Sequence, residues 1–448
     1  MNGSSPHINR ATAVGVDASG DVFAAGSLTN AESDSDFTVV KLAAANGVER
    51  WRRVLNGSAN GSDNASVVAV DAAGDVVAGG TISDTGATGG FTVLKLRGRS
   101  GKEQWRQVIQ GPARGESVNA LVVDATGDVI AAGLTTLSTV GPGITAFTVV
   151  KLDKSSGAED WRYVIADSPT GRANAVAVDA VGDVIAGGAV PKAGSRPGFA
   201  VFKLDGASGG ERWRYTAVGS TAPGVADGVS KLAADAAGNV VAVGAVTNAG
   251  TQADFAVVKV NGVSGVELWH QTLNGTANAF DRAHAVAVDA AGDVFAAGFL
   301  ANTATGSDFT VVKFDGLTGA ERWRKVLPAP GGCCVGGAQT VDVDDAGDVV
   351  VAGWTLNPDA SPNYFTIVKF DGFSGVESWR RIISTPTGCC LSGVSAVYAA
   401  GDVIGAGSIQ DNDGSHYTVV KLRGRDGGDF GTNACRGEGS FCLRGRAR

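Results

Sequence analysis

The sequence has few of the residues that usually build catalytic or metal centres. Its 448 residues include only 4 histidines, 6 cysteines and 1 methionine. The histidines, His7, His270, His284 and His416, show no spacing typical of a metal site or a catalytic triad. Clusters of lysine and arginine are also missing, and the formal net charge is −8. This charge argues against nucleic acid or an anionic membrane surface as the main partner.

Long apolar stretches and helical patterns are absent as well. No apolar run approaches the roughly 18 residues that a membrane-spanning helix needs. The first residues, MNGSSPHINR, have neither the basic nor the apolar region of a signal peptide. No segment shows sustained helical periodicity, whereas 66 glycines indicate many turns. These features predict an all-β protein with no transmembrane segment.

One short motif recurs through nearly the whole chain. It reads Gly-Asp-Val, or Gly-Asn-Val once, followed by small apolar residues and glycine, and its copies are 53 to 56 residues apart. The acidic or amide position falls at Asp21, Asp75, Asp128, Asp183, Asn239, Asp293, Asp348 and Asp402. A fixed period of this length is the signature of a repeat architecture.

A second motif accompanies the first in each repeat. An aromatic residue precedes a lysine by four positions, and in seven repeats a tryptophan follows that lysine by ten. The lysines are Lys41, Lys95, Lys151, Lys203, Lys259, Lys313, Lys369 and Lys421. The tryptophans are Trp51, Trp105, Trp161, Trp213, Trp269, Trp323 and Trp379.

Each repeat predicts four short antiparallel strands. In one repeat, residues 283–298 form two alternating runs around a turn, and residues 307–315 and 321–327 follow as a third and a fourth strand. Four-stranded repeats arranged radially are β-propeller blades. We therefore predict a single eight-bladed propeller over residues 2–424, with a repeat of about 54 residues, and an irregular tail over 425–448. The last blade is incomplete in this prediction, because Gly431 replaces its tryptophan.

The repeat resembles that of the bacterial secreted β-propeller proteins called SBBP repeats. The resemblance rests on D-F-x-x-x-K, G-x-E-x-W, N-G and A-V-A-V-D-x-x-G-D-V in succession. The D-x-x-x-G-x-x-x-W portion, for example Asp315, Gly319 and Trp323, is also similar to the tryptophan-docking motif of PQQ-type quinoprotein propellers. The first resemblance implies a bacterial protein that is secreted, periplasmic or on the cell surface. The second implies an alternative, an oxidoreductase using PQQ and calcium.

The recurring charged residues predict structural roles. Folding the third and fourth strands about the middle of their turn would place Lys41 opposite Glu49 and Val39 opposite Trp51, giving a cross-strand ion pair in each blade. Asp17 and its equivalents are expected to cap hairpin turns, with a calcium site as the alternative. The repeated tryptophans are expected to pack between blades.

The two remaining connections of each repeat vary in length. From the hairpin Asp or Asn to the next aromatic is 15 to 19 residues, and from tryptophan to the next hairpin Asp or Asn is 22 to 26. In a four-stranded meander both connections emerge on one face. Since scaffolds carry binding sites on variable loops, a protein or carbohydrate partner is expected there. The predicted molecule is a monomeric, non-catalytic binding scaffold without a predicted cofactor.

Two pairs of adjacent cysteines lie on these variable connections. Cys333 and Cys334 precede the seventh hairpin, and Cys389 and Cys390 occupy equivalent positions one repeat later. They are candidates for disulfides, for a thiolate metal site, or for a redox lid over a cofactor. In the tail, Cys435 and Cys442 are candidates for a further disulfide.

Three other residues mark the same sector as a candidate partner site. Trp354 stands where other repeats have smaller residues or Phe, Tyr364 lies on the same variable connection, and His416 belongs to the eighth repeat. Departures from a repeat are where function often lies.

The N-terminal residues align with the interior of a repeat. NGSSPHINRATAVGVD matches NGTANAFDRAHAVAVD at 274–289 without gaps, so the chain starts just after a fourth strand. We hypothesise a gene start further upstream, encoding a signal peptide and the closing strand. Reading the upstream DNA tests this hypothesis, and a stop codon without a preceding tryptophan strand contradicts it.

Overall fold

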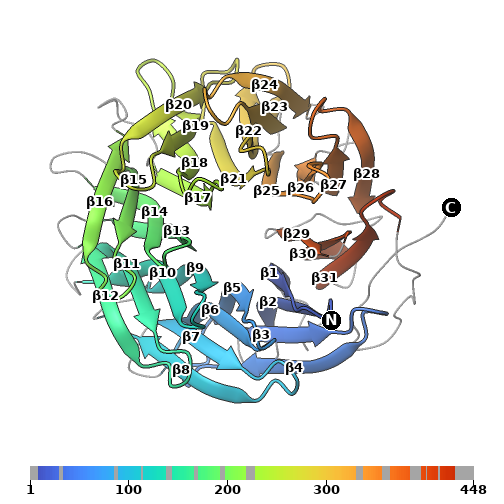
Figure 1. The fold of residues 1–448 in the computed structure, drawn as a ribbon. Helices are drawn as coiled ribbons and strands as arrows, with labels where there is room; N and C mark the ends of the chain where they lie inside the picture. The colour runs from blue at the N-terminus through green and yellow to red at the C-terminus, as the bar shows by residue number, and fades with distance from the viewer. Residues whose placement is uncertain are drawn as a thin grey trace. The chain divides into compact units, whose positions relative to one another are not determined.

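The structure is a computed structural model built almost entirely of short antiparallel strands (Figure 1). It describes residues 9–29, 34–84, 89–111, 115–137, 144–165, 170–191, 197–217, 228–328, 336–355, 364–383, 395–399, 401–411 and 414–428. Two compact units are present. Unit 1 comprises Met1–Ile144, Val150–Arg162 and Ile383–Arg448, and unit 2 comprises Thr145–Val149 and Tyr163–Ile382.

Unit 1 contains the first two repeats, most of the third and the last. The first sheet consists of β1 (Arg10–Val16), β2 (Val22–Thr29), β3 (Ser35–Leu42) and β4 (Glu49–Leu55). The second consists of β5 (Asn64–Val70), β6 (Val76–Ile82), β7 (Gly90–Leu96) and β8 (Glu103–Ile109). The third, which contributes to both units, consists of β9 (Ser117–Val123), β10 (Val129–Thr136), β11 (Thr145–Leu152) and β12 (Glu159–Ile165). The last consists of β29 (Ser395–Ala399), β30 (Asp402–Asp411) and β31 (Gly414–Arg423).

Unit 2 contains four complete repeats. They are β13 (Arg172–Val178), β14 (Val184–Pro191), β15 (Pro197–Leu204) and β16 (Glu211–Ala217); β17 (Gly228–Ala234), β18 (Val240–Thr247), β19 (Ala253–Val260) and β20 (Glu267–Leu273); β21 (Arg282–Val288), β22 (Val294–Asn302), β23 (Gly306–Phe314) and β24 (Glu321–Leu327); and β25 (Gly337–Val343), β26 (Val349–Thr355), β27 (Tyr364–Phe370) and β28 (Glu377–Ile383).

The expectation of eight four-stranded blades is wrong, because the described strands complete seven. The eighth repeat forms only the three strands β29–β31 in the described residues. Its sequence has no Glu-x-Trp-Arg segment, and this segment forms the fourth strand of nearly every other blade. The all-β class and the antiparallel order of strands within each blade are confirmed.

The middle strands of the blades are buried on both faces. Every described side chain of β2 and β18 is buried, whereas the charged residues of β4 and β20 are half-buried or exposed. Within unit 2, for example, Val241 and Val257 of one blade pack with Val294 and Val312 of the next. A strand covered on both faces reads as a continuous apolar run, and so the second and third strands show little alternation.

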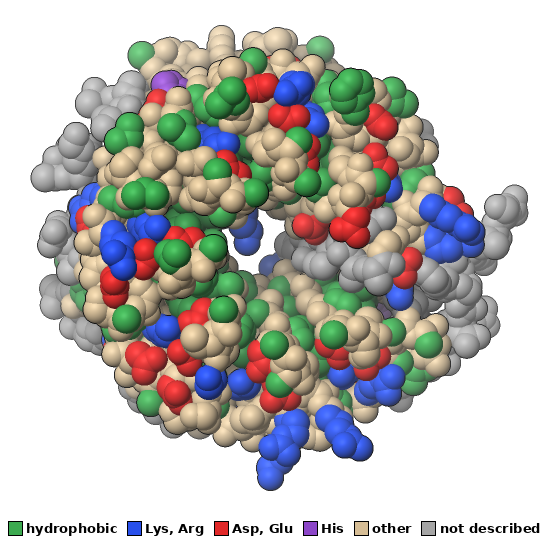
Figure 2. Space-filling view, viewed as in Figure 1, with side chains coloured by type: hydrophobic (Ala, Val, Ile, Leu, Met, Phe, Trp, Pro, Cys, Tyr) green, Lys and Arg blue, Asp and Glu red, His purple; other side chains and the backbone are tan. Residues whose placement is uncertain are grey.

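Charged side chains of both signs are interspersed on the face shown in Figure 2. On the described part of that face no extended patch of one sign is present. Within the described residues, no helix is long and apolar enough to cross a membrane.

Candidate functional site

The first hairpin turn of each blade is held by an aspartate. Asp17 Oδ1 accepts the backbone N–H groups of Ser19 and Asp21 at 3.0 and 2.9 Å. Gly20 has a positive φ of 81°, which closes the turn without a Cβ clash. Equivalent bonds are made by Asp71, Asp124, Asp179, Asp235, Asp289 and Asp344. The prediction that these residues cap turns is confirmed.

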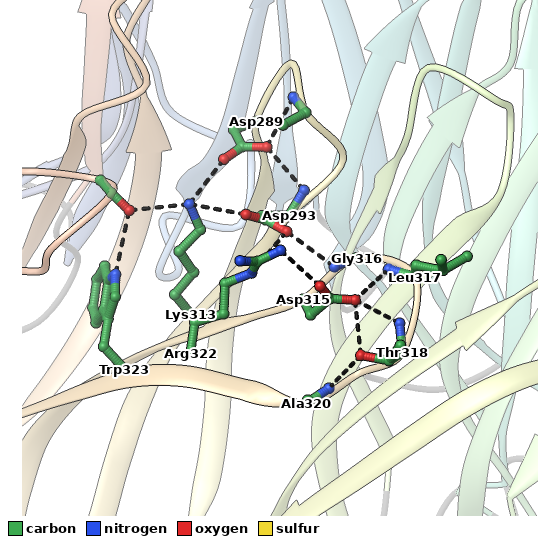
Figure 3. A network of polar contacts seen from close by, with 12 residues as sticks. Asp289, Asp293, Lys313, Asp315, Gly316, Leu317, Thr318, Ala320, Arg322 and Trp323 are labelled. Atoms are coloured by element: carbon green, nitrogen blue, oxygen red, sulfur yellow. Dashed lines mark hydrogen bonds and ion pairs between the residues drawn. The ribbon is translucent and has the colours of Figure 1, made fainter.

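The same aspartates bind the repeated lysine. In the blade β21–β24, Lys313 Nζ lies 3.2 Å from Asp289 Oδ2 and 3.1 Å from Asp293 Oδ2 (Figure 3). The ammonium also donates to Gly372 O of the next blade at 3.0 Å. Arg322 extends the network by binding Asp293 and Asp315. One buried cation therefore joins two carboxylates and two blades.

The predicted pairing of each lysine with a glutamate is wrong. Lys41 aligns with Trp51, and Leu42 aligns with Glu49, because an irregularity in register falls between Lys41 and Leu42. The prediction assumed that the chain folds back at the middle of the turn. It therefore did not allow for the extra residue that the fourth strand contains at this irregularity. Glu49 instead binds Arg52 on its own strand at 2.7 Å.

The tryptophans link neighbouring blades, as expected. Trp51 Nε1 donates to Gly98 O of the next blade at 2.9 Å. Gly101 has a φ of 66°, and a Cβ there would lie 2.7 Å from Trp51 Cε3. The indole thus rests on a turn that only glycine fits. The same donation to the next blade is made by Trp105, Trp213, Trp269 and Trp323.

Four of the turn carboxylates are stabilised in their charged form. Burial alone would raise the pKa of Asp17, but bonds from Lys41 and Ser19 outweigh it and lower the pKa below its usual value. The pKa values of Asp124, Asp179 and Asp235 are lowered by the same balance. A carboxylate held in this way neither accepts a proton readily near neutral pH nor leaves its lysine. The arrangement is suited to joining blades.

A surface pocket of about 410 Å³ lies over one such network, between the first and second blades. Asp17, Asp21 and Lys41 line it, with Arg50 and Arg99 beside them. Arg50 Nε binds Asp21 at 3.0 Å, so most of the charge in the pocket is already paired.

The other end of the blades carries a second network, which the sequence reasoning missed. The loop 274–281 follows β20, and its Asp281 is fully buried. Asp281 Oδ2 accepts Gly275 N–H at 2.7 Å, and Oδ1 accepts Ala301 N–H of β22 at 2.6 Å. Asn274 Nδ2 donates to Asn278 Oδ1 at 2.6 Å, and Asn278 has a φ of 49°.

Loop 56–63 repeats these contacts one for one. Asp63 accepts Gly57 N–H at 2.5 Å and Ser83 N–H at 2.6 Å, and Asn56 Nδ2 donates to Asn60 at 2.8 Å. The signal that could have found both loops is N-G-x-x-N-x-x-D, present at 56–63 and 274–281. We call these two segments the N-G loops.

Both N-G loops bury a carboxyl group beside another acid. Burial raises the pKa of Asp281 to about 6, the bonds from Ala301 and Gly275 oppose this shift, and the charge of Asp254 adds to it. Burial likewise raises the pKa of Asp63, with Asp36 as the neighbouring charge. Asp17, Asp124, Asp179 and Asp235 at the hairpin turns therefore have lowered carboxyl pKa values, whereas Asp63 and Asp281 in the N-G loops have raised ones.

The structure places the predicted partner residues as follows. Trp354 of β26 aligns with Phe365, and Thr355 aligns with Tyr364 of β27, so Trp354 and Tyr364 point to opposite faces of their blade. Both are half-buried. His416 of β31 aligns with Ile409 and is also half-buried, but it lies in unit 1. Trp354 and Tyr364 thus do not form one patch.

The cysteine predictions lie outside the described residues. Cys333, Cys334, Cys389, Cys390, Cys435 and Cys442 are all in segments that the structure does not describe. The disulfide, metal and redox interpretations remain predictions. Across the described ranges, no group of three or more histidines, cysteines or carboxylates gathers to hold a metal. Asp344, an equivalent of Asp17 with calcium as its alternative, and Asp348 bind Lys369 at 2.7 and 3.1 Å.

Comparison with solved structures shows a shared fold. Sqt1 from Saccharomyces cerevisiae has a TM-score of 0.55 and 11% identity, covering 94% of this chain and 99% of Sqt1. A europium-containing methanol dehydrogenase has a TM-score of 0.51 and 11% identity, covering 90% and 83%. The quinohemoprotein alcohol dehydrogenase of Comamonas testosteroni has a TM-score of 0.50 and 12% identity, covering 90% and 71%. Two dehydrogenases and Sqt1, whose name indicates no enzymatic activity, thus share this fold.

Comparison of sequences assigns the family. No curated protein matches the chain. The family model PQQ_2, described as outer membrane protein assembly factor BamB, matches residues 10–143, 38–192 and 146–412. These matches span most of the chain and all its complete blades. With blades joined by repeated tryptophan contacts, the chain is a β-propeller protein that belongs to the BamB-like PQQ_2 family.

Proposed function

We propose that this protein is a non-catalytic, extracytoplasmic binding scaffold that holds a protein or carbohydrate partner at the end of the blades carrying the N-G loops. The observation that carries the proposal is the contrast between the two ends of each blade. At the hairpin turns, repeated Lys–Asp ion pairs fix each blade, and bonds from the lysine and the tryptophan to backbone carbonyls join it to the next blade. At the opposite end, the connections differ in length from repeat to repeat.

The N-G loops support this assignment because they make that end rigid. Asp281 bonds its own loop and β22 together, and Asp281 N–H donates to Ala253 O of the preceding blade at 2.6 Å. A rigid base presenting dissimilar loops is the usual construction of a binding surface. The family description, an assembly factor, also favours a protein that holds other proteins.

The alternative is a quinoprotein-like oxidoreductase that uses PQQ and calcium. Similarity of fold to a quinohemoprotein and to a europium-containing dehydrogenase is its basis. The described residues do not fit a metal-assisted quinone site, because no three candidate ligands converge among them.

Cross-linking with mass spectrometry on the native protein and its extracytoplasmic extract tests the scaffold proposal. Cross-links to one partner are expected at the variable connections, and Trp354→Ala or Tyr364→Ala is expected to weaken capture. Phe373→Ser, which alters a fully exposed apolar residue at the hairpin-turn end, is the matched control. Cross-links that cluster at the hairpin turns contradict the proposal.

A titration with PQQ and Ca²⁺ separates the two functions. Saturable quinone absorbance changes together with dye-linked alcohol oxidation support the enzyme and overturn the scaffold. Absence of both leaves the scaffold as the function to be examined by cross-linking.

A further inference from the structure

The seam between the blades β17–β20 and β21–β24 contains a pair of buried carboxyl groups. Asp281 belongs to the N-G loop 274–281, and its N–H donates to Ala253 O on β19. Asp254, the next residue of β19, is 4% exposed, and Asp281 is fully buried. Backbone pairing thus brings the two acids to the same seam, where water cannot screen them.

The four oxygens of the pair are not equally satisfied. Both oxygens of Asp281 accept backbone N–H groups, from Gly275 and Ala301. Asp254 Oδ2 accepts Asn248 Nδ2 at 2.6 Å and Thr251 Oγ1 at 3.1 Å. In this fully described region, Asp254 Oδ1 is buried and has no hydrogen-bond partner. A buried acceptor without a donor costs about 1–3 kcal/mol, more if it is charged.

In the part of the chain that the structure describes, the two acids are not members of an ion pair. Arg282 follows Asp281 at the start of β21, and Asp308 on β23 lies at the next seam, where Gly336 N–H donates to Ser307 O. The Arg282 guanidinium lies 5.4 Å from the centre of the Phe280 ring, and Asp308 Oδ2 accepts bonds from Asn302 and Thr305. Among the described residues, no lysine or arginine forms an ion pair with Asp254 or Asp281. Two uncompensated charges in one dry seam repel each other strongly.

We propose that Asp254 and Asp281 share one proton, which bonds the orphaned Asp254 Oδ1 to the Asp281 carboxyl and latches the N-G loop against β19 and β22. The shared proton gives the orphaned oxygen its donor and removes one of the two charges. Loss of this proton at higher pH leaves two buried carboxylates and loosens the loop. The latch lies at the variable end, so it makes that end sensitive to pH whatever partner binds there.

Other repeats show that the capping position accepts both charged and neutral groups. Asp63 and Asp36 repeat the acid pair at the seam of the first two blades. Asn9 takes the same position in the first repeat, where its Oδ1 accepts Thr29 N–H at 2.8 Å. An uncharged amide therefore caps the second strand too. The charge at Asp281 is not required for capping, which leaves its titration as a distinct property.

The test compares Asp254→Asn with Asp308→Asn. Asp308 has the same position on β23 and the same Asn and Thr donors as Asp254, but Gly336 replaces the acid across its seam. Urea unfolding of the full chain at pH 5 and pH 8 is the measurement. If Asp281 titrates near pH 6 in place of 3.9, the wild-type unfolding constant should rise about tenfold between these pH values from this group alone. Asp254→Asn should lose that component, and Asp308→Asn should keep it.

A second measurement does not depend on the variants folding. Carboxyl ¹³C titration of aspartate-labelled wild-type protein should show a carboxyl group with an apparent pKa of about 6 that Asp254→Asn removes. Hydrogen exchange of the peptide containing Gly275 should increase above that pH, after correction for the intrinsic rate. Identical pH responses of wild type and Asp254→Asn, or no such carboxyl group, overturn the proposal.

A metal-ion control separates a proton from another cation. Saturable stabilisation of the wild type by millimolar Ca²⁺ or Na⁺ at pH 8, absent in Asp254→Asn, would make the pair a cation site and overturn the shared proton. Stabilisation by acid alone supports it. Neither result bears on the scaffold function, which the cross-linking experiment tests separately.

Discussion

At the scale of the residue, the repeated lysine has the largest structural role. Lys313 is nearly fully buried and is the common partner of Asp289, Asp293 and Gly372 O. Its ammonium also lies over the Phe295 ring, 4.8 Å from the ring centre. Removing such a cation leaves two buried carboxylates without compensation.

Lys313→Met should therefore lower the free energy of unfolding by about 3–5 kcal/mol, as measured by urea denaturation. Glu321→Gln is the control, because it removes an exposed ion pair with Arg324 in the same blade and should cost no more than about 1 kcal/mol. Equal losses in the two variants would show that the buried cation has no special role.

At the scale of the element, the turn between the third and fourth strands joins adjacent blades. Gly101 combines a positive φ with close contact to the Trp51 ring. Gly74, in a first hairpin turn, has a φ of 77° but nothing within 4 Å of a Cβ. The two glycines therefore separate backbone strain from packing.

Gly101→Ala should destabilise more than Gly74→Ala in thermal or urea unfolding. Each pays about 1–2 kcal/mol for the left-handed backbone, and Gly101→Ala adds about 1–3 kcal/mol of overpacking against the indole. Adding Trp51→Ala to Gly101→Ala should remove the overpacking cost and leave the cost of the left-handed backbone unchanged. If Gly74→Ala is as unstable as Gly101→Ala, close packing of the Trp51 ring on Gly101 does not contribute to stability.

At the scale of the whole molecule, the two kinds of carboxylate give stability opposite dependences on pH. The lowered pKa values of Asp17, Asp124, Asp179 and Asp235 mean that the unfolded chain binds more protons in acid. Their contribution is present above the unfolded value of about 3.9 and is lost as the pH falls through the folded values. The raised pKa of Asp281 acts the other way and costs stability as the pH rises through about 6.

Unfolding free energy should consequently rise from pH 3 to about pH 5 and then decline modestly toward pH 7. Urea unfolding at half-unit steps of pH measures this profile. Asp179→Asn should flatten its acid side, while leaving the decline near pH 6 in place. If that variant instead removed the decline, the assignment of the two carboxylate classes would be reversed.

The sequence alone determined the repeat, the all-β class, the four-strand meander, the turn-capping aspartates and the inter-blade tryptophans. These follow from local rules: strand alternation, turn chemistry and a fixed period constrain each repeat independently.

Tertiary structure decided the partners of the charged residues. Lys41 pairs with Asp17 and not Glu49, because one extra residue shifts the fourth strand and the second strand brings the hairpin turn within reach. It also decided that Trp354 and Tyr364 face opposite sides of a blade. Finally, it brought Asp254 and Asp281 together, since only the packing of successive blades places two acids from different repeats in one dry seam.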